Sequence, residues 1–458
     1  MTETVDPEDG LPVPQRYWSI AVIGLAITMA VLDSAVANVA LPTIAREFRV
    51  DSADAIWIVN AYQLAVVVSL LPLASLGEII GYSRVYLIGL ALFTVASLAC
   101  AMSSTLVELT LARVLQGFGG AGIMAINAAL VRFTYPTRLL GRGIGLNAFV
   151  VSFASAVGPT VASAILATAS WQWLFAINVP IGILTFLIAL KALPKTVTTA
   201  RRFDFVSASL NALAFGLIIS GIDLVTRSGN LLLGAGVLVG GFGAAAALAT
   251  RELSRAHPLL PLDLLRIPIF GLSVATSICS FCAQMLALVS LPFYFESALG
   301  RSAVETGLLL TPWPIAIAIV GPLAGRLSDR YPTAILGGAG LVLLAIGLAL
   351  LALMPETATG FDIGWRMVIC GIGFGLFQAP NNRTMISAAP RPRSGAAGGM
   401  LATARLTGQT LGATLVAIFL ALSPGQGETI SLAVGACLAL AGAVASVSRL
   451  PSERAGRA

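Results

Sequence analysis

The feature that most constrains this chain is a succession of apolar runs, each about long enough to cross a lipid bilayer. The first run, 18–40, contains a single charged residue, Asp33. A helix rises about 1.5 Å per residue and the hydrocarbon core is about 30 Å thick, so about 20 apolar residues span it. Only 10% of the 458 residues are charged, against about 25% in soluble domains. The pattern therefore predicts an all-α integral membrane protein rather than a large soluble one.

Charged, Pro or Gly breaks separate fourteen such runs, and we expect one membrane-spanning helix in each. A cleavable leader is not expected, because residues 1–16 are polar and contain four acids, unlike a basic leader. The approximate limits of the helices are 18–40, 54–73, 85–102, 106–131, 143–166, 171–190, 205–225, 231–248, 269–297, 303–325, 333–354, 367–382, 396–422 and 428–448.

Basic residues concentrate on one side of this predicted topology. Of the 27 Lys and Arg residues, Arg113 and Arg405 lie inside helices, and the outer segments hold only Arg46, Arg49, Arg227, Arg301 and Arg366. The positive-inside rule then places both termini in the cytoplasm. The positive net charge is a sign of membrane topology, and we expect no nucleic-acid partner.

The chain resembles itself at an offset of about 250 residues. The matches keep their order and pair Ser52-Ala53 with Ser302-Ala303, Leu76-Gly77-Glu78 with Leu327-Ser328-Asp329, Arg113 with Arg366, Asn127 with Asn381, and Gly158 with Gly412. Both copies start on the same side, which predicts two six-helix bundles in parallel repeat, with the seventh and eighth helices inserted between them. The expected parts are two cytoplasmic tails, the bundles and a linker: 1–17, 18–190, 191–265, 266–448 and 449–458.

Three segments carry a family resemblance. Leu32–Pro42, Trp57–Tyr62 and Trp171–Pro180 resemble motifs of the major facilitator superfamily, and within it of the fourteen-helix drug:proton antiporter branch. The resemblance covers nearly the whole chain. It implies a rocking, alternating-access transporter in a bacterial inner membrane.

Asp33 is the sharpest candidate site. A carboxylate inside a spanning helix is costly and by default suggests function, here exchange of a proton and attraction of a cationic substrate. Arg113 lies at about the same depth, so it is the candidate partner, and the resemblance associates it with proton transfer. Either residue could instead belong to a static ion pair. Arg405 is a third charge inside a helix, and the sequence assigns it no role.

Other candidates follow from the expected fold. Asn38, Asn127, Phe281, Gln284, Met285, Phe377, Gln378 and Asn381 are predicted to line a central cavity, although each could be a packing residue. Gly158 and Pro159 predict a kink in the fifth helix, and the resemblance places that helix between the halves. Glu78, Asp329 and Arg330 are candidates for a conformational latch at the cytoplasmic ends of two helices, or for solvated charges.

These features favour proton-coupled efflux of lipophilic, cationic drugs or toxic compounds by a monomer. Export of a specific metabolite or antibiotic by the same machinery is the alternative, and a non-transporting receptor is a distant one. The sequence shows no nucleophile, metal cluster or phosphate loop of an enzyme. Cys279 and Cys282 form a CxxC inside an apolar run without a histidine, which we attribute to packing. We therefore expect no cofactor and no metal, with the proton gradient as the energy source.

Overall fold

In the computed structural model of the protein, residues 10–136, 139–196, 198, 203–227, 231–253, 262–355, 357–389, 394–423 and 425–451 are described. Every regular element among them is helical. The helices are α1 (Gln15–Phe48), α2 (Ser52–Ala55), α3 (Trp57–Ile80), α4 (Tyr82–Met102), α5 (Leu106–Thr134), α6 (Leu140–Thr168), α7 (Trp173–Ala176), α8 (Asn178–Ala192), α9 (Phe205–Arg227), α10 (Leu231–Leu253), η2 (Leu262–Arg266), α11 (Pro268–Phe293), η3 (Tyr294–Ala298), α12 (Ala303–Leu310), α13 (Pro312–Arg330), α14 (Thr333–Ala352), α15 (Gly360–Ala388), α16 (Ser394–Leu422) and α17 (Gly427–Val447).

The predicted membrane architecture is confirmed. Within the described residues, 13 helices or helix pairs are long and apolar enough to cross a membrane, and α6, with 29 residues, has the length for a fourteenth span. Four spans are each made of two consecutive helices. In one of them Pro312 begins α13 directly after α12, a position where its missing N–H costs no helical hydrogen bond.

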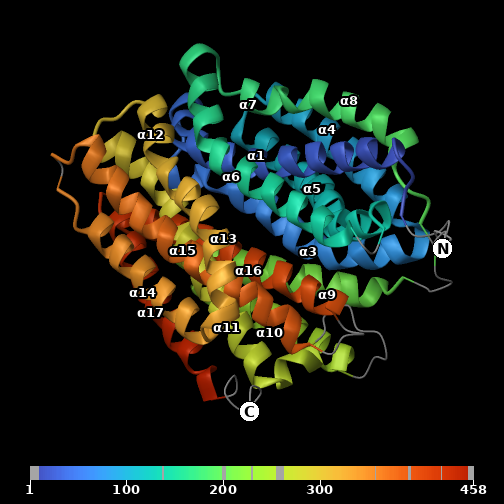
Figure 1. The fold of residues 1–458 in the computed structure, drawn as a ribbon. Coiled ribbons are helices and arrows are strands. Elements are labelled where there is room, and N and C mark those ends of the chain that lie inside the picture. Colours follow the sequence, from blue (N-terminus) through green and yellow to red (C-terminus); the bar gives the residue numbers. More distant parts are fainter. Residues whose placement is uncertain are drawn as a thin grey trace.

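The two halves repeat the same helix packing. In the first half α5 packs on α3 and α4, and α1 packs on α6 and α8; in the second half α15 packs on α13 and α14, and α11 on α16 and α17. Figure 1 shows the first half, coloured blue to green, beside the second half, coloured yellow to red. This is the parallel repeat of two six-helix bundles that the sequence predicts. The exact limits of the predicted domains stay a prediction, and the terminal tails lie partly outside the described residues.

Glycines at matching positions bring helices together in both halves. A Cβ atom on Gly119 of α5 would lie 2.8 Å from the carbonyl oxygen of Gly89 on α4, and a Cβ atom on Gly373 of α15 would lie 2.6 Å from that of Gly340 on α14. Only glycine allows the backbones to approach this closely, as is typical of membrane helices. Matching caps support the same alignment: Thr105 at the start of α5 and Thr359 at the start of α15 each accept a hydrogen bond from the third helical N–H.

Helices α9 and α10 form the two-helix insertion. They pack mainly against each other, and α9 also touches α3 of the first half and α16 of the second (Figure 1). The side-chain amide of Asn211 on α9 donates a hydrogen bond to the carbonyl oxygen of Val68 on α3, at 2.9 Å. Both inserted helices are 23 residues long, so each can span a bilayer.

Two polar contacts join the halves at one end of the bundle, the end at which α1 ends. There Arg46 of α1 forms an ion pair with Glu296 of η3, at 2.6 Å. The hydroxyls of Thr160 on α6 and Thr311, between α12 and α13, lie 2.9 Å apart. These polar contacts hold the halves together at this end.

Candidate functional site

Asp33 and Arg113 form an ion pair inside the first half. Asp33 lies on α1 and is only 3% exposed, and Arg113 lies on α5 and is fully buried. A guanidinium N–H of Arg113 donates to Oδ2 of Asp33. Breaking such a pair from one side is costly, because it leaves an uncompensated buried charge. The contact that their equal depth suggested is therefore present.

Amide side chains complete the hydrogen bonding of this carboxylate. Gln116, one turn after Arg113 on α5, donates to Oδ1 of Asp33 at 2.7 Å and accepts from Nη1 of Arg113 at 2.6 Å. Asn178 of α8 donates to the same Oδ1 at 3.2 Å. Asp33 is thus a charged acceptor surrounded by donors from two neighbouring helices. We name Asp33, Arg113, Gln116 and Asn178 the acid network.

Tyr62 covers the acid network on one side. The guanidinium carbon of Arg113 lies 4.2 Å from the centre of the Tyr62 ring, close enough for a cation–π interaction. Nε of Arg113 also donates to the carbonyl oxygen of Ile58, at 3.2 Å, one turn before Tyr62 on α3. Helix α3 therefore holds Arg113 by both its backbone and its aromatic ring.

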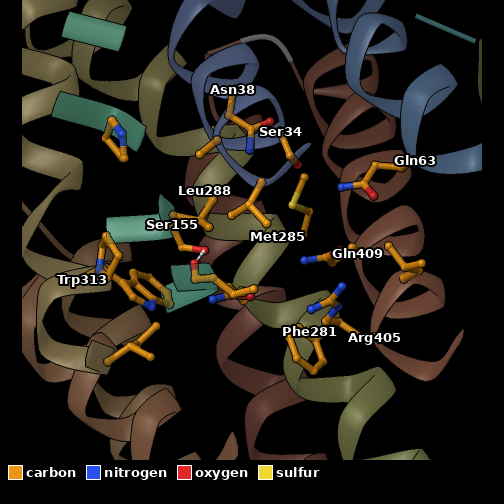
Figure 2. A pocket seen from close by; sticks show the side chains of 18 of the residues that line it. Ser34, Asn38, Gln63, Ser155, Phe281, Met285, Leu288, Trp313, Arg405 and Gln409 are labelled. Atoms are coloured by element: carbon orange, nitrogen blue, oxygen red, sulfur yellow. Dashed lines mark hydrogen bonds between the residues drawn. The ribbon is translucent and has the colours of Figure 1, made fainter. Parts of the chain in front are cut away.

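A cavity of about 220 Å³ lies between the halves, and Tyr62 is one of its lining residues. Helices α1, α3 and α6 of the first half and α11, α13, α15 and α16 of the second contribute most of its wall. Figure 2 shows Ser34, Asn38 and Gln63 facing Phe281, Met285, Trp313 and Arg405 across it. Asp33 and Arg113 are not among the lining residues. One tyrosine thus touches both the acid network and the central cavity.

Five of the eight residues predicted to bind substrate line this cavity. They are Asn38, Phe281, Gln284, Met285 and Gln378. The other three, Asn127, Phe377 and Asn381, do not line it. On α15 the lining residues Phe374 and Gln378 are one turn apart, and Phe377 and Asn381 occupy another face, because each residue turns a helix by about 100°.

The buried position of Asn381 has a structural explanation. Its side chain accepts a hydrogen bond from Arg449 at 2.7 Å and donates one to Ser277 at 2.8 Å. Arg449 is fully buried and also donates to Ser273 at 2.7 Å. These bonds join α11, α15 and the end of α17 inside the second half, away from the cavity.

The cavity also contains polar residues that the sequence did not single out for binding. They are Ser34, Tyr62, Gln63, Ser155, Trp313, Arg405 and Gln409. Tyr62 lies in the Trp57–Tyr62 motif, and Arg405 was visible as a charge inside a helix. The direction in which each side chain faces was not predictable, since cavity-facing and lipid-facing surfaces are both largely apolar.

Gly158 and Pro159 lie where α6 meets the other half. A Cβ atom on Gly158 would lie 2.6 Å from the Cβ of Ala35 on α1. Pro159 lines the cavity, and its carbonyl oxygen would be 2.6 Å from a Cβ atom on Gly307 of α12. These small residues let α6 pack closely on both its own half and the other one.

The residues of the predicted latch lie at helix ends. Glu78 is exposed in the last turn of α3, and Arg330 is exposed at the end of α13. The side chain of Asp329 lies outside the described residues. Ser328 accepts a hydrogen bond from Arg383 of α15 at 2.9 Å, within the second half. A latch at these positions stays a prediction.

Comparison with known proteins identifies the family. The model described as Major Facilitator Superfamily matches residues 23–413. This chain belongs to that superfamily. It is 53% identical to the uncharacterized transporter YebQ of Escherichia coli K12 over 97% of this chain and 98% of the relative.

Within the described residues no group of His, Cys, Asp and Glu could hold a metal ion.

More distant relatives differ in the compounds named for them. The transporter is 30% identical to the riboflavin transporter RibZ of Clostridioides difficile, over 89% of each chain. It is 28% identical to the multidrug efflux pump LfrA of Mycolicibacterium smegmatis, over 96% of this chain and 90% of the relative. A crystal structure of a POT family transporter with 5-aminolevulinic acid has the same fold, with a TM-score of 0.73 at 15% identity and coverage of 95% and 96%. The chain is a membrane transporter of small molecules.

Proposed function

We propose that this transporter is a proton-coupled exporter of amphipathic compounds, a member of the drug:proton antiporter branch that works as a monomer by alternating access. The observation that carries the proposal is Tyr62, which stacks on Arg113 of the acid network and also lines the central cavity. Tyr62 therefore connects the acid network, in which Asp33 would be protonated, with the cavity in which the substrate would bind. The resemblance implies a bacterial inner membrane, and the positive-inside rule favours cytoplasmic termini.

The proposed coupling step starts at the ion pair. Protonation of Asp33 removes the charge that holds Arg113, and a guanidinium left unpaired in this buried position is unfavourable. Arg113 retains the carbonyl of Ile58 and the face of Tyr62 as partners. A shift of Arg113 toward them would move Tyr62 and alter the cavity wall. Substrate binding and protonation would then oppose each other, as antiport requires.

The contacts between the halves fit alternating access. With the termini in the cytoplasm, the Arg46–Glu296 pair and the Thr160–Thr311 contact close the cavity toward the outside. Two packed rigid bundles with a site between them can rock about that site. The described conformation would then be the one that loads substrate from the cytoplasm.

The cavity wall has features that suit a lipophilic compound and features that suit a specific polar metabolite. Phe281, Met285 and Trp313 suit lipophilic drugs, because aromatic and thioether groups pack adaptably. Gln63, Gln284, Gln378 and Gln409 also line the wall. Four amides can position a polar ligand, and this observation favours a specific metabolite as the second candidate.

Transport in inverted membrane vesicles tests the proposal. A panel of fluorescent anionic, neutral and cationic amphiphiles would be offered with and without an imposed pH gradient. We expect gradient-dependent accumulation by the wild type and its loss in Asp33→Asn. Asp51→Asn, an exposed acid beside α2, is the matched control and should transport normally. Accumulation by Asp33→Asn that still follows the gradient would refute the coupling role.

A further inference from the structure

At the central cavity lie several of the buried polar atoms that have no hydrogen-bond partner. Among the described residues they include the hydroxyl of Tyr62, the indole N–H of Trp313, Nε of Arg405 and the side-chain oxygen of Asn38. All four residues line the cavity. Buried polar groups are normally paired, and leaving one unpaired costs free energy. A substrate that supplies the missing partners would recover that cost.

These atoms are mostly donors, and they come from both halves. Trp313 and Arg405 can only donate, and the hydroxyl of Tyr62 can donate or accept. Tyr62 belongs to α3, Trp313 to α13 and Arg405 to α16. A matching ligand therefore presents several acceptor oxygens, and it contacts both bundles at once. Binding of such a ligand would therefore affect both six-helix bundles.

Arg405 sets the charge of the cavity. Among the described residues that line the cavity it is the only Lys or Arg, and none of them is Asp or Glu. No ion pair of Arg405 is found in the described part of the chain. Asp33 and Arg113 neutralise each other behind Tyr62. An uncompensated guanidinium in a low-dielectric cavity attracts anions and repels cations.

We propose, on the basis of the function proposed above, that the cavity selects amphipathic aromatic anions, with the carboxylate or phenolate of the substrate bound by Arg405. Gln409 lies one turn further along α16 and supplies a second donor beside Arg405 (Figure 2). Phe281 and Met285 lie close by in the same view and form the wall on which an aromatic ring can pack. The guanidinium is suited to a carboxylate because its fork of donors matches the two oxygens.

The charge that a substrate meets in the cavity differs from the one expected from Asp33. The expectation of a cationic substrate depended on Asp33 acting on the substrate directly. In the structure the carboxylate of Asp33 is bound by Arg113, Gln116 and Asn178 and does not line the cavity. The charge that a substrate meets is that of Arg405.

Equilibrium binding to purified transporter in nanodiscs, without any gradient, tests the inference. The probes share one aromatic body and differ in charge: 2-naphthoate, 2-naphthalenemethanol and 2-naphthylmethylammonium. We expect the wild type to bind naphthoate at least about tenfold more tightly than the ammonium compound. Arg405→Gln should weaken naphthoate binding by about tenfold or more while changing the neutral probe less than about threefold, and Arg405→Lys should keep the preference for the anion.

The control is Arg266→Gln, which removes the same charge from an exposed site on η2 and should bind all three probes as the wild type does. Thermal unfolding of each variant shows that it is folded. An unchanged ratio of anion to cation affinity in Arg405→Gln overturns the inference, as does a wild type that prefers the cation or binds none of the probes. Because no proton gradient is involved, anion binding without proton-driven transport would refute the proposed function alone.

Discussion

Gly307 offers the most specific test of how the two halves close. A Cβ atom at this position would lie 2.6 Å from the carbonyl oxygen of Pro159 and would overlap the hydroxyl of Ser163, both on α6 of the other half. A backbone carbonyl cannot rotate away, so Gly307→Ala must push α12 from α6. Overpacking of this kind costs about 1–3 kcal/mol, and the whole cost falls on the conformation in which these helices touch. The closed population should therefore fall by about 5–150-fold.

Cross-linking measures that population. The hydroxyls of Thr160 and Thr311 are 2.9 Å apart, so cysteines at these two positions should form a disulfide in the closed state, and mass spectrometry would identify the linked peptides. Gly307→Ala should slow this oxidation, and adding Ser163→Ala should restore part of the rate. Gly321→Ala on α13 is the control, since a Cβ atom there meets nothing within 4 Å. Cross-linking of Gly307→Ala at the control rate would refute the reasoning.

Two further predictions concern residues on either side of the cavity wall. Tyr62→Phe removes only the unpartnered hydroxyl and keeps the ring over Arg113, so substrate affinity should fall about 2–10-fold while proton coupling stays intact. Tyr62→Ala should lose proton coupling as well. Equilibrium binding measures the affinity, and gradient-driven transport measures the coupling. Arg449→Gln breaks a buried set of hydrogen bonds away from the cavity and should lower the free energy of unfolding by about 2–4 kcal/mol, seen as a lower melting temperature, with substrate affinity unchanged. A weaker affinity in Arg449→Gln would show that this network reaches the site.

The sequence predicted the fold well because lipid imposes a simple rule on it. The backbone hydrogen bonds of each span must form within the span, and apolar side chains must cover them. Each spanning helix therefore appears in the sequence as a run of apolar residues. The predicted run 269–297, for example, corresponds to α11 and η3, Pro268–Ala298. The prediction missed the break at Pro312 inside one span, because a proline next to a spanning run can begin a new helix as easily as it bends one.

The candidate site was only partly predictable. The pairing of Asp33 with Arg113 followed from their depth, which sequence position determines directly. Gln116 and Asn178 were not foreseen as partners of Asp33, since their contribution depends on how three helices pack. Nor could the sequence show that Asp33 faces away from the cavity while its neighbour Ser34 lines it. Tertiary packing determines which way a side chain points from a helix, and the pattern of apolar residues in the sequence does not predict it.

Proton exchange by the purified protein is the most direct test of the claim that Asp33 couples the proton to the substrate. Substrate would be added to the transporter in weakly buffered detergent solution with a pH-indicating dye, at a series of pH values. If Asp33 links the proton to the substrate, the wild type releases protons when substrate binds, and Asp33→Asn binds substrate without releasing them. Equal proton release by the wild type and Asp33→Asn would contradict the account, because the proton would then come from another group.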